Sequence, residues 1–134
     1  MKHIQRAICM MMIMLGVSAC SDDESLLENK WQLRQIQHDE ETSGLADHVF
    51  YNFQKGSFSA ICLHEDGEYY IFFGNYSLNR NEISIVLLPE SNYGEVYERY
   101  INWENGNRTF TVDKLTGSTL CLEYGGTLFA FRKY

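Results

Sequence analysis

The chain has 134 residues, which suits one domain and leaves no room for a second. Its 18 Asp and Glu outnumber its 11 Lys and Arg, which gives a formal net charge of −7 at pH 7. An acidic chain is repelled by nucleic acid and by a bare anionic membrane surface. The composition therefore excludes nucleic acid as a partner.

The first 19 residues have the layout of a secretory signal peptide, with a basic tip ahead of an apolar run over residues 7–17. That run is too short to span a bilayer, since a membrane helix needs about 20 apolar residues. Val17-Ser18-Ala19-Cys20 follows and resembles the bacterial lipobox, at which the Cys is acylated. The resemblance implies that residues 1–19 are removed and that Cys20 carries a lipid. An ordinary cleaved signal with an incidental Cys is the alternative.

Residues 20–29 are polar and acidic apart from two leucines, and they are predicted to form a flexible tether. Ser21-Asp22-Asp23-Glu24 resembles the surface-export signal of Bacteroidetes lipoproteins, although a solvated acidic linker would look the same. Together these features imply a lipid-anchored protein of the outer membrane, with exposure at the cell surface as one option. The membrane would be a partner through the N-terminal lipid alone.

From residue 30 onward, apolar and polar residues alternate with the period of two that is typical of strands. In the first strand, Trp31 and Leu33 share a face with Gln35 and Gln37, while residues 38–47 are predicted to form a loop. After the strand that begins at Trp31, we expect further strands at residues 49–53, 57–63, 69–78, 83–87, 109–115, 119–124 and 127–134.

Glycines and the single proline divide these strands. Asp66-Gly67 is the strongest hairpin signal, because Asp-Gly supplies the positive φ angles of a type I′ turn, and Gly125-Gly126 closes the last hairpin. The alternation slips at Gly74, where we expect a β-bulge. Pro89 ends a strand, and residues 90–106 are irregular with a possible short helix over 95–103.

About eight short antiparallel strands and almost no helix predict an all-β protein. An up-and-down barrel over residues 30–134 removes the exposed sheet edges and is the expected fold, with a two-sheet β-sandwich as the alternative. At eight strands, the interior of a barrel is either filled by side chains or holds one small ligand.

Five short segments carry a further similarity: Lys30-Trp31, Phe53-Gln54-Lys55-Gly56-Ser57-Phe58, Gly74-Asn75-Tyr76-Ser77-Leu78, Arg108-Thr109-Phe110-Thr111-Val112 and Phe131-Arg132-Lys133-Tyr134. Together they resemble the lipocalin-like domains of small Bacteroidetes lipoproteins over nearly the whole mature chain. In lipocalins, a Gly-x-Trp opens the first strand, and an Arg on the last strand packs across that Trp to close the barrel base. The resemblance places Trp31 and Arg132 in these structural roles, although Asn29 stands where the Gly would be.

The sequence holds no nucleophile elbow, no glycine-rich phosphate loop and no spaced His/Cys group. His38, His48 and His64 lie in predicted turns and strand ends, where solvated histidines are expected. We therefore expect no enzyme activity, no catalytic residues, no cofactor and no metal site.

Two aromatic groups are the candidates for binding. One could line a ligand cavity or fill the barrel solidly. The other lies in the irregular segment, where aromatic side chains could form a protein interface or cap one barrel end. The first group is Tyr69, Phe73, Tyr76, Phe110 and Phe129, and the second is Tyr93, Tyr97, Tyr100 and Trp103.

Two functions therefore compete. The expected function is that of a lipid-anchored barrel that binds a small apolar ligand inside. The alternative is a protein-interaction or accessory module with a filled barrel that contacts its partner through residues 90–106. An open apolar cavity of at least about 300 Å³ would favour the ligand, and a filled barrel would favour the protein partner.

Cys62 and Cys121 are predicted to stay unpaired even in an oxidising compartment. Large aliphatic residues flank both cysteines, so both thiols are expected to point away from the core. They fall on about the third and seventh strands of a simple meander, nearly opposite each other, whereas a disulfide needs Cα atoms within about 7 Å.

Overall fold

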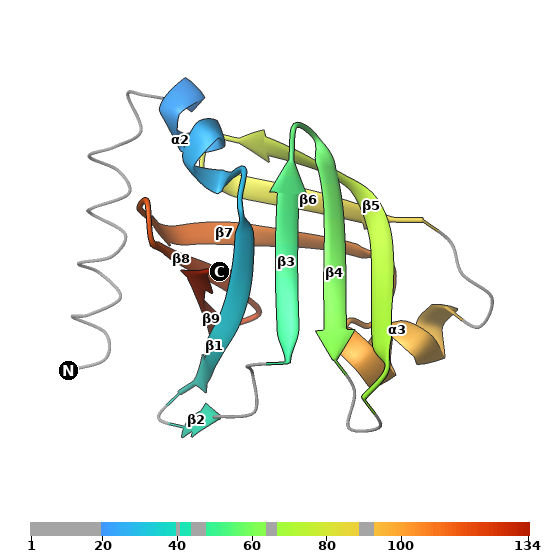
Figure 1. The fold of residues 1–134 in the computed structure, drawn as a ribbon. Coiled ribbons are helices and arrows are strands. Elements are labelled where there is room, and N and C mark those ends of the chain that lie inside the picture. The colour runs from blue at the N-terminus through green and yellow to red at the C-terminus, as the bar shows by residue number, and fades with distance from the viewer. Residues whose placement is uncertain (1–19, 40, 44–47, 64–66, 89–92) are drawn as a thin grey trace.

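The computed structural model describes residues 20–39, 41–43, 48–63, 67–88 and 93–134, and residues 1–19, predicted to be a signal peptide, lie outside this part (Figure 1). Its strands form one antiparallel sheet in the order β2-β1-β3-β4-β5-β6-β7-β8-β9, and β1 also pairs with β9. This pairing closes eight strands into an up-and-down barrel, as predicted, and rules out the β-sandwich. The elements are α2 (Cys20–Leu27), β1 (Lys30–His38), β2 (Glu41–Ser43), β3 (Val49–Gln54), β4 (Ser57–Leu63), β5 (Tyr69–Asn79), β6 (Glu82–Leu87), α3 (Tyr93–Ile101), β7 (Asn107–Leu115), β8 (Thr119–Tyr124) and β9 (Thr127–Lys133).

Tight turns join most of the barrel strands. Lys55 and Gly56 both have positive φ, at 45° and 86°, and connect β3 to β4, which matches a type I′ turn. The predicted hairpin is confirmed by the antiparallel pairing of β4 with β5, in which Leu63 faces Tyr69. Residues 64–66, and with them the turn type expected at Asp66-Gly67, lie outside the described part. β2 is a three-residue addition that pairs only with β1 in the segment predicted as a loop. Neither described helix is long and apolar enough to cross a membrane.

β5 runs without interruption from Tyr69 to Asn79, and its register to β4 and β6 does not shift. The predicted bulge at Gly74 is therefore wrong. The even-numbered side chains of this strand, such as Phe72 and Tyr76, face the core throughout. Gly74 instead allows the backbone of β6 to approach β5 closely. A Cβ at this position would collide with the carbonyl of Val86 and would lie 2.8 Å from the Cα of Leu87.

Gly74→Ala is consequently expected to lower the free energy of unfolding by about 1–3 kcal/mol, because the obstructing atoms are backbone and cannot rotate away. Gly117→Ala is the matched control, since a Cβ there meets nothing within 4 Å. Urea unfolding of both variants checks this. Equal stabilities would show that β5 and β6 can move apart at no cost.

Register shifts occur at two other places, between Leu33 and Gln35 on β1 and between Val112 and Lys114 on β7. The first is a bulge that changes which face the following residues occupy. Trp31 and Leu33 are buried, but Ile36 then packs against the core while Gln35 is exposed. The predicted grouping of Gln35 and Gln37 with Trp31 is therefore wrong beyond Leu33.

The two helices lie at opposite ends of the barrel (Figure 1). Residues 20–29 were predicted to be a flexible tether, but Cys20–Leu27 is helical and Leu27 is fully buried. The indole Nε1 of Trp31 donates a hydrogen bond of 3.0 Å to the Leu27 carbonyl, which fixes the helix end to β1. At the other end, α3 confirms the short helix expected in the irregular segment.

Candidate functional site

Aromatic rings occupy the barrel interior. Tyr51 lies among several of them, with its ring centroid 4.8 Å from that of Phe131 and 5.2 Å from that of Phe58. The ring centroids of Phe53 and Phe58 are 5.1 Å apart. These distances are those of rings in direct contact. These rings pack on one another. Among the described residues, the largest side chains that are fully buried are Trp31, Trp103, Tyr97, Phe53, Phe58 and Phe110.

A buried hydrogen bond joins residues 90–106, the segment predicted to be irregular, to this core. The Trp103 Nε1 donates to the hydroxyl of Tyr51 over 3.0 Å, and both side chains are buried. Burial raises the pKa of Tyr51 to about 12, although the Trp103 hydrogen bond and the positive charge of Arg108 act in the opposite direction. The Tyr51 side chain is therefore neutral at physiological pH, and its hydroxyl links Trp103 to the core.

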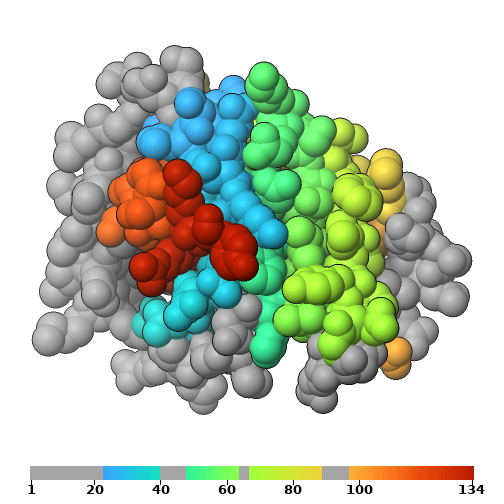
Figure 2. Space-filling model, viewed as in Figure 1, coloured from blue at the N-terminus to red at the C-terminus, as the bar shows by residue number. Residues whose placement is uncertain are grey.

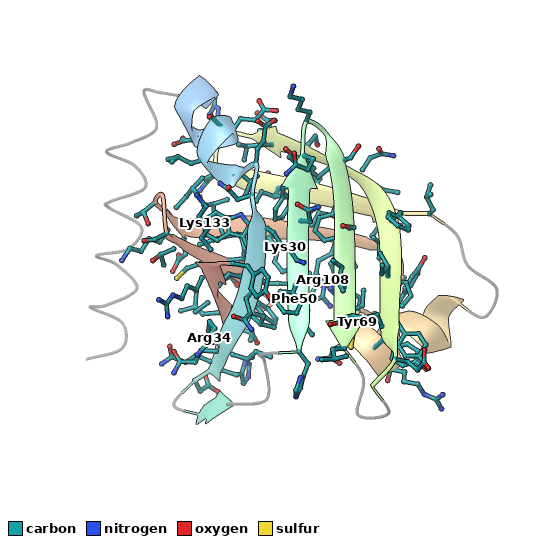
Figure 3. The ribbon with its side chains drawn as sticks, in the orientation of Figure 1. Lys30, Arg34, Phe50, Tyr69, Arg108 and Lys133 are labelled. Atoms are coloured by element: carbon teal, nitrogen blue, oxygen red, sulfur yellow. The ribbon has the colours of Figure 1, made fainter. Side chains whose placement is uncertain are left out.

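Arg108 is a buried charge near the α3 end of the barrel (Figure 3). Its guanidinium carbon lies 4.0 Å from the centroid of the Tyr124 ring and 5.0 Å from that of the Trp103 ring. It donates hydrogen bonds to the Asn102 carbonyl and to Glu104, at 3.1 and 3.2 Å. Sequence reasoning missed this role, although Arg108, Phe110 and Val112 alternate on β7 and share its inward face.

Glu104 completes the cluster from the loop between α3 and β7. Its Oε2 accepts a hydrogen bond from the Tyr124 hydroxyl at 3.0 Å, and its Oε1 pairs with Arg108. The Tyr124 hydrogen bond is the main reason why the pKa of Glu104 is lowered, with the charge of Arg108 acting in the same direction. Through these contacts, Arg108 and Glu104 hold the connection between α3 and β7 onto the barrel.

The five predicted cavity residues do not lie together. Tyr76 and Phe110 are buried and Phe129 is half-buried against the core, so these three help to fill the interior. Tyr69 and Phe73 are 63% and 57% exposed, on the outside of β5. For these two residues the predicted cavity position is wrong.

The aromatic residues predicted to form an interface are mostly part of the barrel end. Tyr97 and Trp103 are buried, and the Tyr97 hydroxyl donates to the Leu88 carbonyl at 2.6 Å. Tyr100 stacks on Tyr70 with ring centroids 4.0 Å apart. The Tyr93 side chain lies outside the described part of the chain. Tyr97 and Trp103 therefore cap one end of the barrel, which was the alternative, and the prediction that they form a protein interface is wrong.

The expected pairing of Arg132 with Trp31 is also wrong. Trp31 is fully buried on the inner face of β1. Arg132 pairs in register with Gln32, the next residue on β1, and its side chain is exposed on the outer face. The arginine that packs over tryptophan in this barrel is Arg108, over Trp103.

No disulfide joins Cys62 and Cys121, as predicted, and they lie on β4 and β8, which are not neighbours in the sheet. The reasoning about faces holds only for Cys121, because Leu120 and Leu122 beside it are buried. Cys62 is itself buried, on the inner face of β4.

The histidines lie on the surface where they are described. The exposed His38 is hydrogen-bonded through Nδ1 to the Thr127 hydroxyl at 2.8 Å, His48 is exposed, and His64 lies outside the described residues. Within the described ranges, no three His, Cys, Asp or Glu side chains are grouped so that they could hold a metal ion.

Apolar side chains gather on the outside of β3 to β6, where they are half-buried on β3 and β4 and exposed on β5 and at the end of β6. Ile61 faces both Phe50 and Ile71 across the sheet, Leu63 faces Tyr69, and the Leu88 amide bonds to the Phe73 carbonyl. None of the outward positions of β4 and β5 carries a charge. Figure 2 shows this side of the molecule, with β3 to β5 in green to yellow-green. We call this surface the apolar outer face; it consists of Phe50, Ile61, Leu63, Tyr69, Ile71, Phe73, Val86 and Leu88.

Known proteins share this architecture. A crystal structure of a lipocalin-like protein from Bacteroides uniformis ATCC 8492 is 55% identical, with a TM-score of 0.75, and the match covers 81% of this chain and 99% of that one. An uncharacterized protein from Bacteroides eggerthii DSM 20697 is 40% identical with a TM-score of 0.71 and the same coverage of both chains. No curated protein sequence matches the chain.

A family model described as a lipocalin-like domain matches residues 12–134, which is almost the whole sequence. The match agrees with the closed eight-stranded barrel and with both solved structures. The chain therefore belongs to the lipocalin-like domain family.

Proposed function

We propose that this protein is a lipid-anchored lipoprotein of the cell envelope whose filled barrel binds another envelope protein through the apolar outer face. The observation that carries the proposal is the row of exposed Tyr69, Ile71 and Phe73 on one uninterrupted strand. Contiguous exposed apolar patches on soluble domains mark interaction sites, and large aromatic side chains are the usual anchors of protein interfaces.

The lipid anchor follows from the lipobox-like residues that end at Cys20. Cys20 is the first residue of α2, and the buried Leu27 ends that helix against the barrel. Acylation at this position would hold the barrel close to the outer membrane. Partners anchored in the same membrane would then meet it at a raised effective concentration.

The ring contacts in the interior argue against the expected small apolar ligand. A ligand at the position of these rings would have to separate side chains that contact one another, such as Tyr51 and Phe58, and protein cores are in general packed as densely as organic crystals. The outer face needs no rearrangement. Because the outward positions of β4 and β5 are uncharged in an otherwise acidic chain, the partner that fits is a protein with an uncharged, apolar surface.

Photocrosslinking in the native host tests this proposal. A crosslinking amino acid in place of Phe73 is expected to give one discrete adduct whose mass exceeds that of the chain and differs from that of two copies. The same residue in place of Asn79, at the end of β5, is expected to give none. Ile71→Asp should reduce the Phe73 adduct about tenfold, because a charge would be buried at the interface. Asn79→Asp adds the same charge outside the apolar outer face and should not.

Two results would contradict the proposal. One is an adduct from position 73 whose yield Ile71→Asp does not reduce, because crosslinking would then reflect random collisions and not binding through the apolar outer face. The other is an adduct with the mass of two copies, which would identify the partner as a second copy of this chain.

A further inference from the structure

A second surface feature lies on the outside of β1, β8 and β9. It is an open hollow of about 560 Å³ whose lining includes Arg34, Gln35, Ser118, Thr119, Ala130 and Arg132. Its form follows from the register of the sheet, because Ala130 lies between Gln35 on β1 and Cys121 on β8. The single methyl group of Ala130 leaves space where its neighbours have longer side chains.

Two arginines line this hollow from the adjacent strands β1 and β9. Arg132 pairs in register with Gln32, and Arg34 lies two residues further along β1, at the bulge (Figure 3). Arg34 donates to Gln32 Oε1 at 3.3 Å. Among the described residues, Arg108 forms an ion pair with Glu104, whereas neither Arg34 nor Arg132 pairs with a described carboxylate. Two neighbouring arginines that no described carboxylate pairs with are unexpected in a chain of net charge −7.

The other side of the hollow supplies hydroxyl groups. Thr119 pairs in register with Arg132, and the amides of Ser118 and Thr119 both donate to the Thr116 hydroxyl, at 3.2 and 3.0 Å. These two hydrogen bonds fix the turn that carries the Ser118 and Thr119 side chains at the edge of the hollow. The site therefore combines two planar five-donor groups with two hydroxyl donors.

We propose that this hollow binds a phosphate group. A guanidinium fork matches two oxygens of an oxyanion, so a carboxylate is satisfied by one arginine, whereas the additional oxygens of a phosphate can be shared between two. The hollow lies on β1, β8 and β9, while the apolar outer face lies on β3 to β6. The phosphate site is thus separate from the proposed protein interface and does not depend on it.

Titration of the full-length protein, purified from membranes in neutral detergent, tests the site. Isothermal calorimetry with inorganic phosphate and with dimethyl phosphate, at constant ionic strength, separates a free phosphate from the phosphodiester of a lipid headgroup. Arg34→Gln and Arg132→Gln are each expected to weaken binding about tenfold, as the loss of a charged hydrogen bond does. Arg99→Gln, which removes an exposed charge from α3, should leave the affinity unchanged.

Saturable binding of either probe that both hollow variants weaken supports the proposal, and the tighter probe identifies the source of the phosphate. The absence of saturable binding to both probes would overturn it. So would an affinity that Arg34→Gln and Arg132→Gln leave unchanged, or that Arg99→Gln lowers equally, since the effect would then come from overall charge. Circular dichroism of each variant confirms that these exposed substitutions leave the barrel folded.

Discussion

Trp103→Ala is expected to lower the free energy of unfolding by about 3–5 kcal/mol, the range for deleting a fully buried tryptophan. The substitution removes an indole whose ring centroid lies 6.1 Å from those of both Phe58 and Phe110. It also leaves the buried Tyr51 hydroxyl without its donor. Chemical denaturation followed by circular dichroism measures the loss.

Two further variants separate the contributions. Tyr51→Phe removes only the hydrogen-bond acceptor and should cost about 1–3 kcal/mol, because the buried indole N–H is then unsatisfied. Tyr69→Ala truncates an aromatic ring that is 63% exposed and should change stability little. A Trp103→Ala variant no less stable than Tyr69→Ala would show that the irregular segment does not enter the core.

Arg108→Ala is expected to destabilise the protein by about 2–3 kcal/mol, since it removes a charged hydrogen bond and uncovers the faces of Tyr124 and Trp103. The loss should be concentrated at the barrel end. Hydrogen exchange of the α3 amides is therefore expected to accelerate more than that of β3 and β4, because Arg108 ties residues 102 and 104 to the barrel.

Arg132→Ala is the matched control for this prediction, since it truncates an arginine that is exposed on the outside of β9. It should leave the unfolding midpoint unchanged. If Arg132→Ala destabilised the barrel and Arg108→Ala did not, the arginine that closes the barrel would be the one on the last strand, and the assignment to Arg108 would be wrong.

The architecture could be predicted from the sequence because apolar and polar residues alternate along most strands and because residues that favour turns separate the strands. The β3–β4 and β8–β9 connections contain Lys55-Gly56 and Gly125-Gly126, and all four residues adopt positive φ. Eight such strands have few ways to avoid open edges, so the closed meander followed from their number. Even the order of Cys62 and Cys121 around the barrel was predictable in this way.

The choice of inner face was not predictable where both faces of a strand are apolar. Residues 69–73 read Tyr-Tyr-Ile-Phe-Phe, so alternation alone cannot decide whether the odd or the even positions face the core. The structure places Tyr70 and Phe72 inward, on the same side as Gly74, whose missing side chain is needed where β6 approaches. Contacts between strands made this choice, and they cannot be seen in a single strand.

Bulges and buried charges account for the other errors. The bulge after Leu33 turns Ile36 inward, and no glycine marks it in the sequence. Arg108 was overlooked because charged residues are rarely buried without a partner, and its partners come from a loop and from other strands. Tyr69 and Phe73, predicted to line a cavity, lie outside because the even-numbered positions of β5 face the core. Tyr97 and Trp103, predicted to lie at an interface, are buried.

Native mass spectrometry of the full protein, extracted from the membranes of its own host, tests most directly whether the barrel is filled by its own side chains. The account predicts the mass of the polypeptide with its covalent lipid, and it predicts that unfolding in organic solvent releases no additional apolar molecule. One apolar molecule bound per barrel, retained in the folded ion and released on unfolding, would contradict it, because the rings around Tyr51 would then have to part to admit a ligand.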